Sequence, residues 1–381
     1  MLSDLQAVEA VVSKAKCPEE VFGALDAADL QSSLKHSYHQ LVKVVHPDRY
    51  ANEEKALSLA QGLFSAVTTW RKRAEEKIDA KTYGDNKPHV EAPPKPASIS
   101  PQVIQTPKRK YIVSDLFARG DLADLYHCAF TEGGVETKAV FKIAQSAADN
   151  DFMDNEQKML NSMYSAKQPE EKFYRYLPKP LDSFLLRGTG GNRRVNVLQL
   201  AEDYVSLEEV MHVYPMGIDF RDCAWMLKRC LAGLGFVHSD KSTIHGGITP
   251  AHVLVHPTGH GAKIVDWCYA ARDPNLLVKA ISKKYKSYYA PEILKKLPVT
   301  GQTDLFMLAK CFVALLGGNV ETNQMPDSVP KQFRAFLSSC LIPAQSMRPD
   351  DAWKLHEDLD ALLLRIGVKP SYRWLEMPAH V

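Results

Sequence analysis

The spacing of apolar residues in the first part of the chain predicts three helices. Residues 3–16 place apolar side chains every three or four positions behind a Ser-Asp pair, which is typical of a capped amphipathic helix. A second helix is predicted up to residue 45, with an apolar face made of Leu34, Tyr38, Leu41, Val42 and Val45. Proline lacks an amide proton and biases the preceding residue away from the helical region, so Pro47 ends this helix. A third helix begins at about Glu53, and its inner face consists of Ala60, Phe64, Val67 and Trp70.

Strand and helix patterns alternate in the second part of the chain, from about Tyr111 to about Ile366. Residues 140–143 have the apolar character of a strand, whereas residues 220–238 have the spacing of a long buried helix. Between the two parts, residues 85–110 are rich in proline and polar side chains. Such a segment favours extended conformations and cannot bury a core, so it is predicted to be a linker.

Length and composition favour a soluble protein with one small and one large domain, because the chain has 381 residues. A formal net charge of +2 gives no general reason to expect nucleic acid or a membrane as partner. The 7 cysteines are odd in number and scattered, without a Cys-x-x-Cys pair, which is typical of reduced core residues. No stretch approaches the roughly 18 uninterrupted apolar residues of a membrane-spanning helix. We therefore expect a cytoplasmic location.

The tripeptide His46-Pro47-Asp48 lies on the exposed turn between the second and third predicted helices. For the three letters alone, a plain helix-ending turn is the alternative interpretation. Together with the apolar faces of the two flanking helices, however, residues 17–84 resemble a J domain of the DnaJ family, preceded by an N-terminal helix in residues 1–16. The resemblance implies a small all-α J domain built around a helical hairpin, with a DnaK-type heat-shock chaperone as the partner.

The same resemblance implies roles for individual residues. His46, Pro47 and Asp48 would contact the chaperone and trigger its ATP hydrolysis, while Lys35 and Lys43 on the preceding helix would steer docking. Because these two lysines are the permanent cations offered by that face, we expect a weaker or more selective electrostatic contact than in generalist relatives. The glycine-rich stretch and the zinc-ribbon cysteines of some DnaJ proteins are absent from the sequence. Another region must therefore choose the protein client.

A second set of motifs begins with Lys142 in Val-Phe-Lys-Ile and Glu156 in a predicted helix. Residues 245–255 then read His-Gly-Gly-Ile-Thr-Pro-Ala-His-Val-Leu-Val, and a later Val-Asp-Trp-Cys contains Asp266. The remaining markers are Ala290-Pro291-Glu292, Asp304 and Arg348. In this order the motifs resemble those of a eukaryotic-type protein kinase. The resemblance implies an α+β bilobal protein-kinase-like fold over residues 111–366, with residues 367–381 as a C-terminal tail.

The kinase resemblance implies a nucleotide site made of Lys142, Glu156, Asp266 and Gly120, in which Asp266 would bind the Mg²⁺ of ATP. A surface lysine and a solvated glutamate are the plainer interpretation of the first two residues. Gly120 is the one glycine kept at the three positions where a phosphate-binding loop carries glycine. Binding of ATP is therefore left open.

The resemblance also implies architectural roles for His245, Glu292, Asp304 and Arg348. Glu292 and Arg348 would form a buried bidentate ion pair, and Asp304 would bond the backbone of the loop at His245. A fold can keep such residues while its catalytic residues change.

The residues that would perform phosphoryl transfer are replaced. Gly247 stands where a kinase has its catalytic carboxylate and cannot orient a hydroxyl, and Thr249 removes the cation that meets the phosphate. His252 replaces an amide ligand, although imidazole suits zinc or copper better than Mg²⁺. We therefore expect no catalytic residue and an inactive, pseudokinase-like domain. The alternative is an atypical active Ser/Thr protein kinase that recruits a displaced acid, for which the candidates are Glu202, Asp203 and Asp240.

Histidines crowd residues 238–260, but in the kinase comparison they fall at framework and turn positions, so no metal site is expected there. The function expected from the whole sequence is that of a co-chaperone. Its N-terminal part would recruit a DnaK-type chaperone and stimulate its ATPase, and its kinase-like part would serve as a client-docking or nucleotide-sensing module. A scaffold with neither activity is a further alternative.

Overall fold

The computed structural model describes residues 2–15, 17–23, 25, 30–50, 53–79, 81–84, 101–165, 170–188, 191–240, 242–272, 278, 280–368 and 372–377. Most of the predicted linker, residues 85–100, lies outside the described residues, as do the side chains of Asp48 and Asp240. The chain divides into two compact units, residues 1–97 and residues 98–381.

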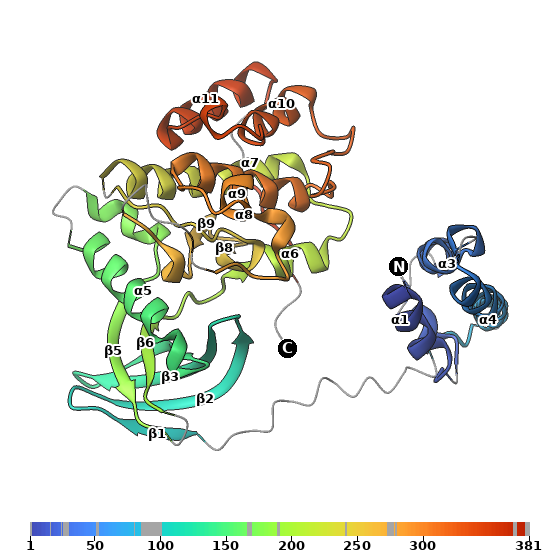
Figure 1. The fold of residues 1–381 in the computed structure, drawn as a ribbon, viewed down its shortest axis with the longest axis horizontal. Coiled ribbons are helices and arrows are strands. Elements are labelled where there is room, and N and C mark those ends of the chain that lie inside the picture. The colour runs from blue at the N-terminus through green and yellow to red at the C-terminus, as the bar shows by residue number, and fades with distance from the viewer. Residues whose placement is uncertain are drawn as a thin grey trace. The chain divides into compact units, whose positions relative to one another are not determined.

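The N-terminal unit is helical (Figure 1). Its described elements are α1 (Leu2–Val12), α2 (Glu19–Phe22), α3 (Leu30–Val45), the 3-10 turn η1 (Pro47–Tyr50) and α4 (Glu54–Asp79). The core lies where the apolar faces of α1, α3 and α4 meet, and it buries Leu5, Leu34, Val45, Ala60 and Val67 to 1% exposure or less. The N-terminal helix is therefore part of this core and not a separate element.

Strands β1 to β6 of the C-terminal unit form one curled sheet in the order β1-β2-β3-β4-β6-β5, and every neighbouring pair is antiparallel. The strands are β1 (Gln102–Gln105), β2 (Lys110–Arg119), β3 (Ala123–Glu132), β4 (Val135–Ala144), β5 (Pro180–Leu186) and β6 (Arg193–Gln199). In the register of β4 with β6, Lys142 lies opposite Asn196. A second antiparallel sheet contains β7 (Val205–Ser206), β8 (Val253–His256) and β9 (Gly261–Ile264).

The helices of this unit lie largely at the end away from the six-stranded sheet, where α7, α9, α10 and α11 gather, while α5 lies beside the sheet (Figure 1). The α-helices are α5 (Asn150–Met163), α6 (Leu207–Val213), α7 (Phe220–Gly235), α8 (Pro291–Leu294), α9 (Gly301–Leu315), α10 (Lys331–Cys340) and α11 (Ala352–Arg365). The main core is built on α7 and α9, where Leu234 and Phe312 are completely buried. Sheet and helices meet at the short turn η6 (Trp267–Tyr269), which contacts α5.

The described part of the C-terminal tail, residues 372–377, packs back on α7 and on the turn between β8 and β9. Arg373 donates to both carboxylate oxygens of Asp222 at 2.7 and 3.0 Å, and the Leu375 side chain is 5% exposed. The Tyr372 ring stacks on the His260 imidazole, which stacks in turn on Trp225. The remaining tail residues lie outside the described part of the chain.

The predicted fold class, a J-domain helical hairpin followed by an α+β bilobal protein-kinase-like fold, is wrong as a description of this structure. The sheet is a curled, all-antiparallel sheet of six strands, and neither it nor the helices around it identify a kinase fold. In the N-terminal unit, α1 and α2 pack with the pair α3 and α4. The motif spacing led to a wrong fold class because sequence motifs describe local segments and do not specify which strands pair.

Strand β1 corrects the predicted linker boundary as well. Val103 pairs with Ile112 and Ile104 with Tyr111, so residues 102–105 belong to the sheet although they follow a Pro-rich segment. Ile104 packs against the apolar cluster that contains Tyr111, and its partial burial stabilises the strand. Among the described residues, no helix is both long and apolar enough to cross a membrane.

Candidate functional site

The first candidate site is the corner between α3 and α4 in the N-terminal unit. Helix α3 ends at Val45, and the turn η1 carries the chain through Pro47 to Tyr50. The His46 ring meets the edge of Phe64 on α4, with ring centroids 5.6 Å apart. Tyr50 is 3% exposed and donates its hydroxyl to the Val44 carbonyl at 2.8 Å. The tripeptide at residues 46–48 therefore lies on a turn whose two ends are held by the packed helices.

A basic face adjoins this corner. Lys35, His36, His39 and Lys43 are all exposed on α3, and Arg49 is exposed on η1, where its guanidinium donates to the Lys43 carbonyl. Among the residues that the structure describes, the permanent cations Lys35, Lys43 and Arg49 are not paired with a carboxylate. The face is therefore open to an acidic partner, and Arg49 adds a cation that was not expected from the sequence.

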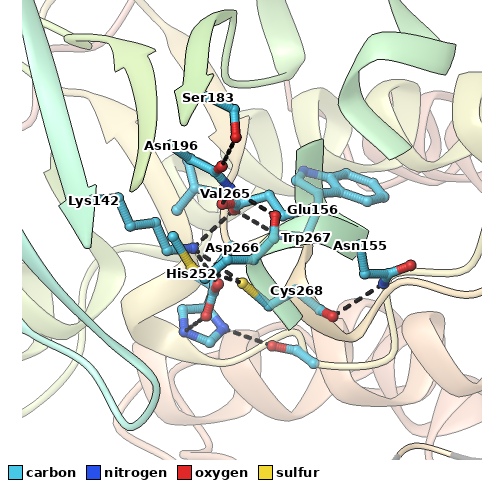
Figure 2. Close-up of polar contacts among 12 residues, drawn as sticks. Lys142, Asn155, Glu156, Ser183, Asn196, His252, Val265, Asp266, Trp267 and Cys268 are labelled. Carbon is cyan, nitrogen blue, oxygen red and sulfur yellow. Dashed lines mark hydrogen bonds and ion pairs between the residues drawn. The ribbon is translucent and has the colours of Figure 1, made fainter. Parts of the chain in front are cut away.

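The second candidate site surrounds Lys142 of β4 in the C-terminal unit (Figure 2). The Lys142 ammonium donates to Glu156 Oε1 at 2.8 Å, to Asp266 Oδ1 at 2.6 Å and to Cys268 Sγ at 3.3 Å. Glu156 lies on α5, whereas Asp266 and Cys268 flank the start of the turn η6. Asn196 of β6 donates to Glu156 Oε2 at 2.9 Å. Three elements distant in sequence thus converge on one ammonium group.

Charge pairing sets the ionisation of these side chains. Burial alone would lower the pKa of Lys142, but the nearby carboxylates of Asp266 and Glu156 outweigh it and raise that pKa well above its ordinary value. Burial would raise the pKa of Asp266, and Lys142 and His252 instead hold it below the ordinary value. For Cys268, burial and the neighbouring carboxylates together raise the pKa of the thiol far above its ordinary value. The centre therefore contains an ammonium, carboxylates and a neutral thiol.

Asp266 is held from a second side by His252. The imidazole Nε2 lies 3.1 Å from Asp266 Oδ2, and its Nδ1 lies 2.7 Å from the Gly247 carbonyl oxygen. Both Asp266 oxygens therefore have a partner, one in Lys142 and one in His252. Asp266 itself adopts the left-handed conformation, with φ 65°, which is uncommon for a residue other than glycine.

The loop that was expected to cradle phosphate is a closed turn. The Gly120 amide donates to the Ala123 carbonyl at 2.9 Å, and the Gln145 side chain donates to the Gly120 carbonyl at 2.8 Å. Its next residue, Asp121, is an exposed carboxylate. Burial, with the carboxylates of Asp121 and Asp266 adding to it, raises the pKa of Tyr289 to about 12. Neither the backbone amide nor the charge suits a phosphate group.

The segment of residues 245–250, which contains Gly247, is buried. A side chain at Gly247 would start 3.1 Å from the Tyr269 ring, which fills the space beside it. Thr249 is fully buried, and its hydroxyl has no hydrogen-bond partner in the described part of the chain. Of the alternative acids, Glu202 is paired with Lys138 at 3.0 Å between exposed side chains. The carboxylate beside this segment is Asp304, which is fully buried and bonded through both oxygens to the amides of His245 and Gly246. Among the described residues, we therefore find no free carboxylate beside Gly247 for an acceptor hydroxyl.

The residues with expected architectural roles lie in the helical part of the unit. Arg348 donates to both Glu292 oxygens, at 2.7 and 3.0 Å, and both side chains are at most 4% exposed. Asp304 accepts from the amides of His245 at 2.7 Å and Gly246 at 2.8 Å, and it contacts His238 Nε2 at 2.9 Å. His245 contributes Nε2 to the Val265 carbonyl at 2.9 Å, which ties the two motif segments together.

Acidification is expected to destabilise the C-terminal unit through His245. Burial, opposed by the Asp304 carboxylate, lowers the pKa of His245 to about 4. The unfolded imidazole has a pKa of about 6.5, so below that pH the unfolded state binds a proton that the folded state excludes. Stability is therefore full above about pH 6.5, falls with pH, and has lost roughly 3 kcal/mol near pH 4.

Urea unfolding followed by tryptophan fluorescence from pH 7 to pH 4.5 measures this loss. A His245→Gln chain keeps a donor for the Val265 carbonyl and should lose stability less steeply than the parent. His212→Gln is the matched control, because His212 is exposed on α6. Equal pH dependence in the parent and in His245→Gln would show that this imidazole is not responsible.

Several contacts of the Lys142 centre were missed from the sequence. Cys268 stands two positions after Asp266, so its closeness could have been noted, but its contact with Lys142 spans 126 residues. Asn196 and Tyr269 carry no signal of their own, because strand pairing and the turn η6 place them. Among the described residues, the group that could share a metal ion is Glu156, Asp266 and Cys268, with ligand atoms within 4.8 Å of one another.

The centre was tested against the Mg²⁺-nucleotide that the kinase resemblance implies. Mg²⁺ prefers six oxygen ligands in octahedral geometry and keeps several waters. Both oxygens of Asp266 are instead bonded to Lys142 and His252, and both oxygens of Glu156 are bonded to Lys142 and Asn196. The third donor of the group is a thiol with 1% exposure. These residues do not fit Mg²⁺. Comparisons of this chain with protein-family models and with curated proteins find no match.

Proposed function

We propose that this protein is a co-chaperone that recruits a DnaK-type heat-shock chaperone through its N-terminal unit and stimulates the ATPase of that partner. One observation carries the proposal. The tripeptide of residues 46–48 lies on a held turn at the end of α3, next to the exposed cations of that helix. The resemblance of this segment to the DnaJ family names the partner.

The local geometry supports recognition by this corner. His46 rests on Phe64, and Tyr50 is anchored to the Val44 carbonyl, so little ordering is needed when a partner binds. Exposed lysines on one helix face attract an acidic surface and raise the association rate, and salt weakens this attraction. The turn therefore positions the tripeptide of residues 46–48, whereas the basic face of α3 attracts the acidic partner.

In this proposal the C-terminal unit chooses the protein client and does not transfer phosphate. Gly247 has no side chain, and the Asp266 carboxylate is bonded on both oxygens. The only hydrolysis in the proposal is therefore performed by the chaperone partner. A cytoplasmic location belongs to the proposal too, because the seven cysteines are free thiols.

Chaperone ATP turnover tests the proposal. Under single-turnover conditions, the full chain should accelerate hydrolysis by a DnaK-type chaperone, and Asp48→Asn should return the rate to that of the chaperone alone. Unchanged stimulation by Asp48→Asn, or no stimulation by the parent chain, would reject the proposal. Circular dichroism of the variant checks that the helices remain.

Two single lysine substitutions in the N-terminal unit test the role of the basic face. Lys43→Ala on α3 should reduce stimulation at low salt, and the difference from the parent should shrink as salt rises. Lys72→Ala is the matched control, since Lys72 is exposed on α4. Equal effects of the two substitutions would remove the α3 face from the proposal while leaving the tripeptide in it.

A further inference from the structure

The side chains around Lys142 have the arrangement of a cation site. Glu156, Asp266 and Cys268 each offer one ligand atom, and these atoms lie within 4.8 Å of one another. His252 approaches the same Asp266 carboxylate from the other side, with Nε2 at 3.1 Å. Two carboxylates, a thiol and an imidazole are the ligand types that zinc and similar ions prefer.

The Lys142 ammonium stands among these donors. Its Nζ lies 2.8 Å from Glu156 Oε1, 2.6 Å from Asp266 Oδ1 and 3.3 Å from Cys268 Sγ. Figure 2 shows Lys142 between these side chains. Glu156 and Cys268 are at most 1% exposed, and Lys142 is 5% exposed. A buried pair of carboxylates needs a nearby positive charge, because an uncompensated charge in the interior is strongly destabilising. The ammonium is the group that supplies this charge.

The remaining oxygens of the two carboxylates are bonded as well. Asn196 donates to Glu156 Oε2 at 2.9 Å, and His252 Nε2 lies 3.1 Å from Asp266 Oδ2. The Trp267 amide also donates to Glu156 Oε1 at 3.2 Å. An incoming metal ion would have to displace Lys142 and leave its ammonium without a carboxylate. A hard ion such as Mg²⁺ has no free oxygen to offset that loss.

We propose that Lys142 is the built-in counter-ion of this centre and occupies the place of a divalent cation, so that the C-terminal unit holds Asp266 in position without metal or nucleotide. The donors around the ammonium are then a masked site for a zinc-class ion. Removing the positive charge should open that site. This inference concerns the C-terminal unit and does not depend on the co-chaperone activity proposed for the N-terminal unit.

Metal titration of the full chain and of Lys142→Met tests the proposal. The parent chain should show no change in melting temperature with Mg²⁺, with Mg²⁺-ATP or with Co²⁺ as the probe of a zinc-class site. Lys142→Met should melt at a lower temperature than the parent without metal. With Co²⁺ it should regain stability and develop thiolate-to-cobalt absorbance at one ion per chain. The absorbance should be lost in Lys142→Met combined with Cys268→Ser.

A control variant and a refolding comparison complete the test. Lys138→Met is the matched control, because Lys138 lies on the same strand but forms an exposed pair with Glu202, and it should neither lose stability nor bind Co²⁺. If Lys142→Met does not fold alone, refolding is compared with and without Co²⁺, and recovery only with the ion supports the proposal. Stabilisation of the parent by Mg²⁺-ATP, or an unstabilised and colourless Lys142→Met chain with Co²⁺, would overturn it.

Discussion

Replacing Arg348 by alanine is expected to lower the free energy of unfolding of the C-terminal unit by about 3–5 kcal/mol. The substitution leaves the buried Glu292 carboxylate without its bidentate partner. It also removes the donors that reach the Ile342 and Pro343 carbonyls at 2.6 and 3.0 Å. The cost arises mainly from the uncompensated charge, since the net value of an intact buried pair is small.

Urea unfolding of the parent and of Arg348→Ala gives the difference in free energy. Arg334→Ala is the control, because Arg334 pairs at 2.6 Å with Asp327, whose side chain is 97% exposed. Such a surface pair contributes about 0–1 kcal/mol. Similar losses for the two variants would mean that burial of the Glu292 pair has little energetic consequence.

Gly217→Ala is expected to cost about 3 kcal/mol, because two backbone segments touch at this residue. An ideal Cβ on Gly217 would lie 2.2 Å from the Leu316 carbonyl carbon and 2.4 Å from the Gly317 nitrogen. The backbone has φ +87° at this position, which favours glycine. Neither neighbouring atom belongs to a movable side chain, so the segments themselves must separate.

Gly134→Ala separates the cost of the backbone conformation from the cost of the steric contact. Gly134 has φ +84° in the turn between β3 and β4, and an added Cβ would meet nothing within 4 Å. Its substitution should therefore cost about 1 kcal/mol from backbone conformation alone. Thermal unfolding of both variants measures the difference. If Gly217→Ala loses no more than Gly134→Ala, the close approach at Leu316 is not limiting.

Local features of the fold could be predicted because single residues determine them. Pro47 ends a helix, and α3 stops at Val45; the third helix was expected from about Glu53, and α4 begins at Glu54. The fold class could not be obtained in this way. Pairing of β1 with β2 depends on burial of Ile104 beside Tyr111, which the proline-rich context of the strand conceals.

The two candidate sites also differ in how far the sequence predicts them. Residues 46–48 are adjacent in sequence, so their common turn could be predicted from the helix that Pro47 ends. The kinase resemblance placed Lys142, Glu156 and Asp266 at one site. It did not predict which of their atoms contact one another there. That Lys142 and His252 would use both Asp266 oxygens depends on side-chain directions, which a one-dimensional pattern does not contain.

The segment of residues 372–377 changes where the C-terminal unit ends as a cooperative folding unit. Helical periodicity stops near Ile366, yet Leu375 is buried and Arg373 neutralises the largely buried Asp222 on α7. Loss of these residues would leave a carboxylate and the face of His260 without their partners. The last helix is therefore not the boundary of the domain, and a chain shortened to that helix would be an incomplete folding unit.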